Sequence, residues 1–281
     1  LICNMYIQGG SKMNNICLKF TVAMIAILTL AANANAVTRT VNCDKGQTIQ
    51  AALEKGQGSA ESLVINVSGI CKEYVSITRD DVSIYGNNNA TIEGTIEVLG
   101  GMRILVDGMT LNGPDIGLHV FGGHAELRDT YVTGNSYGIA VNRNSFLSIF
   151  DSNISNNTSD GLHVIVGSTV EIHNTDILNN IGNGIEIDRH SNADIRDGCK
   201  ISGNDNGVRM YLHSSAFITE TEISNNRSNG ILMDNDSGVI GFGPITISGN
   251  SSNGVLCYDA ESSFETNDVI TDSIKCTDFN Y

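Results

Sequence analysis

The sequence predicts a right-handed parallel β-helix, an all-β solenoid with three short strands in each coil of about 23 residues. Three observations predict this fold. Glycines recur at a nearly constant interval, several other columns keep the same interval, and the composition favours strands and turns. The 281 residues include 30 Gly, only 2 Pro and no Trp, and Ile, Val and Thr between Gly and Asn turns are typical of strands.

The repeat is clearest in a glycine that precedes an apolar-x-apolar strand. Its intervals along the chain are 21, 23, 23, 23, 23 and 24 residues. The members of this column are Gly117, Gly138, Gly161, Gly184, Gly207, Gly230 and Gly254. A constant interval of this size indicates units that stack on one another, because a single unit cannot bury its own apolar residues.

Further columns keep the same register. Seven residues after the glycine stands a serine: Ser145, Ser168, Ser191, Ser214 and Ser237. Eleven after it stands an isoleucine, until Gly241 breaks the column: Ile149, Ile172, Ile195 and Ile218. A third, apolar column is Val132, Ile154, Ile177, Ile201, Ile223 and Ile247, and an asparagine follows each member three residues later: Asn135, Asn157, Asn180, Asn204, Asn226 and Asn250. We expect the isoleucines to share one core and the stacked amides to hydrogen bond along its axis.

The segment before the repeat is expected to cap the open end of the core. Residues 48–55 carry Ile49, Ala52 and Leu53 on one side, which predicts a short amphipathic helix. The first strands are expected at 64–67, 74–77 and 82–85, followed by less regular coils at 91–99 and 104–111. The expected organisation of the domain, 37–281, is an N-terminal cap with the first coils (37–90), regular coils (91–260) and a C-terminal closing tail (261–281).

Residues 1–36 are expected to be a signal peptide that begins at Met13. Lys19 precedes an apolar run over 20–30, and Ala34-Asn35-Ala36 is a small-x-small cleavage motif. The run is too short to span a bilayer, although a short buried helix is an alternative for it. Cleavage after Ala36 predicts a secreted or periplasmic protein with no membrane span in the mature chain.

The charge of the mature chain restricts its partners. Without residues 1–36 it has 14 basic and 31 acidic residues, a net charge of −17. Such a surface repels the phosphates of nucleic acid, so we expect no nucleic-acid partner. An anionic polymer needs local cations to bind there.

We expect a monomer.

Five cysteines remain after cleavage, and export permits disulfides. Cys43 at the start of the first strand and Cys71 at the end of the next are expected to pair, as are Cys257 and Cys276 in the last coil and tail. Each bridge would secure one end of the solenoid, where a coil has a single neighbour. Cys199 is left over, and a buried thiol is expected there rather than a nucleophile.

The entry strand near Val41, the helical cap and the Asn-x-x-Gly-apolar-x-apolar coils resemble the pectate-lyase-like right-handed parallel β-helix superfamily from about residue 41 to 268. The chain looks most like exported bacterial β-helix repeat proteins. Its coils are similar to those of mannuronan C5-epimerases and alginate lyases. The superfamily includes polysaccharide lyases, hydrolases, esterases, epimerases and non-catalytic adhesive proteins. The resemblance therefore implies a polysaccharide partner and leaves the activity open.

Candidate functional residues follow from the alternation of side chains along the strand after each glycine. Its second and fourth residues are expected to face solvent, so adjacent coils bring several polar side chains into one patch. The candidate catalytic residues are His163, Glu186, Arg209, Tyr211 and His213. The candidate substrate-binding residues are Asp188, Arg189, His190, Asp234 and Tyr258.

These residue types suit cleavage or epimerisation of a uronic acid polymer. Either reaction needs a base for the C5 proton, an acid, and a cation that neutralises the sugar carboxylate. His163 or Glu186 is the candidate base, and Tyr211 or His213 the candidate acid. Arg209 is the candidate cation.

The resemblance to the epimerases is incomplete at this strand. Those proteins carry an Asp-Pro-His motif, whereas Glu186, Ile187 and Asp188 stand here, so the motif is absent. No cofactor is expected. Asp188 and Asp234 share a column that could hold calcium, but the sequence has no compact Asp-rich loop to support such a site. Three functions remain open: a lyase or epimerase of acidic polysaccharides, a non-catalytic glycan-binding or cell-surface protein, and a purely structural β-helix whose patch is an ordinary solvated face.

Overall fold

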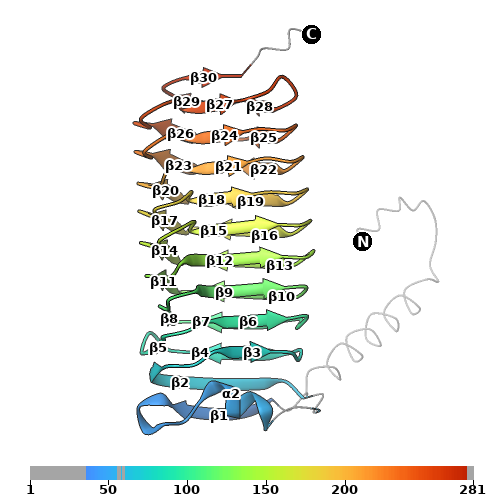
Figure 1. Ribbon diagram of the computed structural model, residues 1–281, viewed down its shortest axis with the longest axis vertical. Coiled ribbons are helices and arrows are strands. Elements are labelled where there is room, and N and C mark those ends of the chain that lie inside the picture. Colours follow the sequence, from blue (N-terminus) through green and yellow to red (C-terminus); the bar gives the residue numbers. More distant parts are fainter. Residues whose placement is uncertain (1–35, 56–57, 59–60, 277–281) are drawn as a thin grey trace, which may run out of the picture. The chain divides into compact units, whose positions relative to one another are not determined.

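The computed structural model describes residues 36–55, 58 and 61–276, and these residues form one parallel solenoid (Figure 1). The expected signal peptide lies outside the described residues apart from Ala36. The chain passes repeatedly through three strands that lie on three faces, and each strand pairs in parallel with its counterpart in the next coil. The predicted parallel β-helix is confirmed.

We name the faces A, B and C. Face A contains β1 (Val37–Asn42), β2 (Leu63–Cys71), β4 (Val82–Tyr85), β7 (Ile104–Asp107), β10 (His124–Arg128), β13 (Phe146–Phe150), β16 (Thr169–His173), β19 (Asn192–Arg196), β22 (Ser215–Ile218), β25 (Gly238–Gly241) and β28 (Ser263–Thr266). Face B contains the end of β2 and β5 (Ala90–Ile92), β8 (Thr110–Leu111), β11 (Tyr131–Thr133), β14 (Asn153–Ser155), β17 (Asp176–Leu178), β20 (Lys200–Ser202), β23 (Thr221–Ser224), β26 (Ile245–Ser248) and β29 (Val269–Thr271).

Face C is a separate ten-stranded sheet. It contains β3 (Val75–Ile77), β6 (Ile96–Leu99), β9 (Ile116–Phe121), β12 (Tyr137–Asn142), β15 (Leu162–Ile165), β18 (Ile185–Ile187), β21 (Val208–Met210), β24 (Ile231–Met233), β27 (Val255–Cys257) and β30 (Ile274–Lys275). The glycine column stands immediately before β15, β18, β21, β24 and β27 and at the second residue of β9 and β12, so it aligns seven of these ten strands.

The core is made of the predicted columns. Ile149, Ile172, Ile195 and Ile218 pair in sequence across face A and are all fully buried. The column on face B that begins at Val132 and ends at Ile247 is likewise fully buried and in register. Burial of these side chains is the main favourable contribution to the stability of the stack.

The predicted asparagine column forms a continuous hydrogen-bonded ladder. From Asn135 to Asn250, each side-chain amide donates to the carbonyl oxygen of the next asparagine at 2.9–3.3 Å. Asn180 is representative: its Nδ2 also donates to the Ile154 carbonyl, and its Oδ1 accepts from both the backbone N–H and Nδ2 of Asn157. Buried turn groups that would otherwise lack a partner are satisfied in this way.

The glycine column is required by close packing beside that ladder. A Cβ atom on Gly184 would lie 2.6 Å from the Gly207 carbonyl oxygen and 2.8 Å from Nδ2 of Asn204. Both contacts are shorter than real Cβ contacts, and neither partner is free to move. The glycine and asparagine columns therefore depend on each other.

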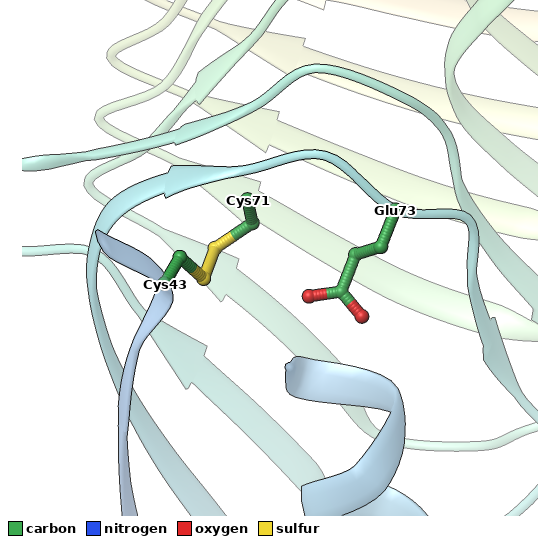
Figure 2. A group of neighbouring side chains, drawn as sticks. All are labelled: Cys43, Cys71 and Glu73. Atoms are coloured by element: carbon green, nitrogen blue, oxygen red, sulfur yellow. A yellow bond between two sulfur atoms is a disulfide. The ribbon is translucent and has the colours of Figure 1, made fainter. Parts of the chain in front are cut away.

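The N-terminal end is closed by the short helix α2 (Ile49–Glu54), which buries Ile49, Ala52 and Leu53 as expected. Glu73 caps the helix from the next coil: its two carboxylate oxygens accept the backbone N–H groups of Ile49 at 2.8 Å and Gln50 at 3.0 Å (Figure 2). A carboxylate at this position satisfies N–H groups that have no partner within the helix.

The disulfides join Cys43 to Cys71 and Cys257 to Cys276, and Cys199 is a buried free thiol. Cys43 lies in the 3₁₀ turn η1 (Cys43–Lys45) that follows β1, and not at the start of a strand. Burial raises the pKa of Cys199 to about 11, so its thiol stays protonated and unreactive at neutral pH. At the other end, the segment expected as a closing tail contains β28, β29 and β30, which continue all three faces in register.

We predict that Asn180→Ala destabilises the solenoid by about 2 kcal/mol, because the buried N–H of Asn157 loses its acceptor. Asn250→Ala at the partly exposed end of the ladder is expected to cost less. Urea denaturation followed by circular dichroism measures both variants. Equal small losses in the two variants would show that the ladder contributes little to stability.

Candidate functional site

The outer surface of face C brings three predicted residues into one column. The register of β15, β18 and β21 places His163 beside Glu186 and Glu186 beside Arg209. The flanking residues of β18, Ile185 and Ile187, point into the core and are fully buried. Their burial fixes the outward direction of the Glu186 side chain between them.

Glu186 is the centre of the cluster, with four side chains around its carboxylate. Oε1 accepts the hydroxyl of Tyr211 at 3.1 Å and lies 3.6 Å from Nε2 of His163. Oε2 accepts Nδ2 of Asn183 at 2.7 Å and lies 3.6 Å from Nη1 of Arg209. Charged, hydrogen-bonding and aromatic groups thus meet at one carboxylate.

Glu186 is only 8% exposed, so the expectation that it faces open solvent was wrong. It does lie on the outer side of face C, but the longer side chains of Arg209 and Tyr211 in the next coil reach back to it. Asp188 was expected to be exposed for the same reason and is 1% exposed. Its Oδ2 lies 3.5 Å from Nε of Arg189, whose side chain is largely exposed.

Tyr211 keeps its proton at neutral pH. Burial raises the pKa of its hydroxyl above the ordinary value, and the negative charges of Glu186 and Asp188 raise it further. The guanidinium of Arg209, which lies 5.0 Å from the centre of the Tyr211 ring, acts in the opposite direction. The Tyr211 hydroxyl is therefore protonated, and its one hydrogen is donated to Glu186.

Several polar atoms on this face have no hydrogen-bond partner. Nε2 of His163, Oδ1 of Asn142 and Oδ1 of Asp188 are buried and unpaired among the described residues. The ring of His163 stacks on Tyr137, with 5.7 Å between ring centres and an angle of 24°. Unpaired buried polar atoms are rare in proteins, and their concentration on one face is a feature that function can explain.

The remaining predicted residues lie at the turn that follows face C, apart from the Glu186 cluster. His190 and His213 stack on each other with 5.0 Å between ring centres, and His213 lies 3.8 Å from Asp236. Asp234 accepts the backbone N–H of Asn235 at 2.9 Å, and Tyr258 is highly exposed. The structure thus divides the predicted patch into two groups.

Two residues of the cluster, Asp160 and Asn183, were missed from the sequence. They belong to a second polar ladder that occupies the position just before the glycines from Gly161 to Gly254. Asp160 accepts the backbone N–H of Asn183 at 2.7 Å, Asn206 donates to Asn183 at 3.0 Å, and the ladder continues through Asn229 to Asn253. The signal was present in the sequence, since this column has the same interval as the others.

Asp160 is an anomaly in that ladder, because a carboxylate stands where later coils have an amide. Its side chain is buried, and burial raises its pKa above the ordinary value of 3.8. The nearby charge of Glu186 raises the pKa further, against the opposing effect of the Asn183 hydrogen bonds. A negative charge at Asp160 is thus unfavourable in the folded protein.

Among residues 36–55, 58 and 61–276, one group of side chains has the spacing of metal ligands. Cys43, Cys71 and Glu73 have donor atoms within 4.8 Å of one another (Figure 2). The two sulfur atoms are bonded to each other, and Glu73 caps α2, so these atoms are already used. Asp188 and Asp234, the pair considered for calcium, do not belong to such a cluster. In the same part of the chain, no helix has the length and apolar character needed to cross a membrane.

Comparisons with known proteins agree with the geometry of the coils. Residues 65–215 match the family model described as the right-handed β-helix region. No curated protein matches the chain.

Three solved structures illustrate the fold similarity. A mutant of the periplasmic alginate epimerase AlgG has a TM-score of 0.57 and 14% identity, over 84% of this chain and 67% of the epimerase. The pectate lyase Pel9A has a TM-score of 0.56 and 12% identity, over 87% of this chain and 80% of the lyase. Tailspike protein 2 of the Escherichia coli O157:H7 bacteriophage CAB120 has a TM-score of 0.54 and 13% identity, over 84% of this chain and 39% of the tailspike. Identities this low establish the shared fold.

We predict that Asp160→Asn stabilises the protein at neutral pH. Because the folded-state pKa of Asp160 is raised, the wild-type protein loses stability as pH rises above the unfolded value of 3.8. Asparagine removes this loss and extends the amide ladder. The gain should therefore be present at pH 7 and vanish below about pH 4. Urea unfolding across this range measures the difference; a gain that persists unchanged in acid would contradict the charge-based explanation.

Proposed function

Because this chain belongs to the family of right-handed β-helix proteins, we propose that it binds or acts on a polysaccharide at the outer surface of face C. The observation that carries the proposal is the convergence of His163, Arg209 and Tyr211 on Glu186. Polar groups and aromatic rings in one open row suit a ligand rich in hydroxyl groups. The solved proteins of similar fold include an alginate epimerase and a pectate lyase, which supports a glycan as the ligand class.

The finer proposal is a lyase or epimerase of an acidic polysaccharide. Arg209 has an exposed guanidinium that can bind the uronate carboxylate and stabilise negative charge as the C5 proton leaves. His163 is the base, because its imidazole is partly exposed and its Nε2 lies 3.6 Å from the Glu186 carboxylate. Tyr211 is the acid, because its protonated hydroxyl lies beside Arg209 and can turn from Glu186 to donate its hydrogen to the substrate.

His163 and Tyr211 together account for every proton that is moved in the two reactions: His163 takes the C5 proton, and Tyr211 gives one back. In β-elimination the C5–H electron pair forms the C4–C5 double bond, the C4–O bond breaks, and Tyr211 protonates the departing oxygen. In epimerisation Tyr211 instead returns a proton to C5 from the opposite face. Glu186 then acts by positioning, since it holds the Tyr211 hydroxyl and lies beside Arg209.

Non-catalytic glycan binding is the second candidate, and the state of Glu186 favours it. In the epimerase-like motif an acidic residue occupies this place, whereas the Glu186 carboxylate is already surrounded by Asn183, Tyr211, Arg209 and His163. A carboxylate with these neighbours is a poor general base.

Two disulfides support a site of action in an oxidising compartment, the periplasm or the cell exterior, because disulfides do not persist in the cytosol. Export through the expected signal peptide accords with this. Determination of the N-terminus of the mature protein from the native host tests cleavage after Ala36.

The two candidates are separated by a screen against alginate, pectate and glycosaminoglycans. Absorbance of unsaturated products reports elimination, incorporation of solvent deuterium at C5 reports epimerisation, and calorimetry reports binding. Binding without either chemical signal selects the non-catalytic protein. Absence of binding to every polymer contradicts the proposed function.

We predict that Arg209→Ala abolishes turnover, or weakens binding if no turnover exists, while the melting temperature barely changes. The half-exposed Arg209–Glu186 pair contributes at most about 1 kcal/mol to folding. Arg128→Ala is the matched control, since Arg128 also pairs with a glutamate and lies over an aromatic ring, but on face A. Equal effects of the two variants on the ligand would show that Arg209 has no specific role.

A further inference from the structure

The outward column of face C that contains Glu186 extends much further toward the N-terminus. Strand register places its members in one row, one per coil: Ser76, Glu97, His119, Ala140, His163, Glu186 and Arg209. The row contains two glutamate–histidine pairs in opposite order, and Ala140 lies between them. Nothing in the proposed function uses the first pair.

The first pair belongs to a cluster that, like the one around Glu186, joins a glutamate to a histidine and a tyrosine. Oε1 of Glu97 lies 3.1 Å from Nδ1 of His119, and Oε2 accepts the hydroxyl of Tyr74. The side chains of Glu97 and His119 are 16% and 20% exposed. Burial and the Glu97 carboxylate raise the pKa of Tyr74 to about 12, so this tyrosine also stays protonated.

The side chains of the two clusters occupy register positions that are related by an approximate twofold rotation about Ala140, although all the strands run in the same direction. Tyr74 precedes β3 by one residue and reaches Glu97 on the next strand of the sheet. Tyr211 follows β21 by one residue and reaches Glu186 on the preceding strand. Each half therefore presents tyrosine, glutamate and histidine in the same order toward Ala140.

We propose that Tyr74, Glu97 and His119 form a second half-site for the same glycan, which lies along the solenoid axis and passes over Ala140. This inference rests on the proposed function. Ala140 has a small, partly exposed side chain, so it leaves room between His119 and His163 for a sugar ring. Tyr137 in the same coil stacks on His163 and supports one side of that space.

The spacing of the half-sites sets a minimum ligand length. Glu97 and Glu186 are four strand steps apart in register, which is about 19 Å at the usual separation of paired strands. A pyranose unit in an extended chain advances by roughly one such step. A chain of about four sugars or more is therefore needed to reach both glutamates.

The two halves differ in the other side chains beside the glutamate, since Asn183 and Arg209 contact Glu186. Arg209 follows Glu186 in the row, whereas Ser76 occupies the equivalent place beside Glu97. A carboxylated sugar is favoured where the guanidinium is present. The half-site at Glu97 instead offers a carboxylate acceptor and an imidazole, which suit sugar hydroxyl groups.

Calorimetry with alginate and pectate oligosaccharides of increasing length, from disaccharides to about octasaccharides, tests the proposal. The affinity of the wild-type protein is expected to rise by about tenfold or more once a chain spans both half-sites, because the second contact is then intramolecular. His119→Ala should remove this rise and leave the affinity for short chains unchanged. Arg209→Ala should weaken both short and long chains.

Ala140→Leu is an independent test, because a larger side chain obstructs the path of the glycan between the half-sites and contacts neither glutamate. It should reduce the affinity for long chains to that for short ones. Ser83→Leu on β4, an outward position of face A, is the matched control and should have no effect. Circular dichroism verifies the fold of each variant.

The outcomes distinguish this inference from the proposed function. Binding that does not depend on chain length, or a loss of short-chain binding in His119→Ala, overturns the second half-site and leaves glycan binding intact. Failure of every oligosaccharide and polymer to bind overturns both. A rise in affinity with length that survives Ala140→Leu overturns the path over Ala140.

Discussion

The regular coils depend on the amide ladder from Asn135 to Asn250. Each amide within it, as at Asn180, donates both hydrogens and accepts two hydrogen bonds, so no capacity is left for water. The ladder fixes the position of each corner relative to the coils on either side. It also leaves no space for a Cβ atom at the neighbouring glycines, as at Gly184 beside Asn204. Register, pitch and the glycine column thus follow from one repeated interaction.

A fixed register has a direct effect on the outer surface. Outward side chains at the same position of successive coils stand in a row at the spacing of paired strands, about 4.8 Å. At that distance long side chains reach their neighbours and cover shorter ones, as Arg209 and Tyr211 do at Glu186. On the outer surface of face C, side chains therefore bury and hydrogen bond to one another. On this face, among the described residues, lie buried polar atoms without a hydrogen-bond partner, at Asn142, His163 and Asp188.

The sequence allowed much of this to be predicted. The isoleucine and asparagine columns were found because an interior position tolerates few residue types and so repeats visibly, and the cysteine pairs followed from their places in the end coils. The burial of Glu186 and Asp188 was not predicted, because it depends on the conformations of side chains in the next coil. The cluster at Glu97 was missed for another reason. The early coils have unequal lengths and lack the asparagine, so the register could not be extended from His119 back to Tyr74 without the structure.

The ladder also has a consequence for the evolution of such proteins. All its amides point the same way along the axis, so a duplicated coil of about 23 residues can join the stack and find the same partners above and below. Duplication or deletion of a unit therefore changes the length of the molecule in whole steps while the interior stays the same. An added coil between His119 and His163 would move the two glutamates apart by one step in a single genetic event. In this architecture the dimensions of a surface can diverge by unequal recombination, and its chemistry by point mutation, with little interference between the two.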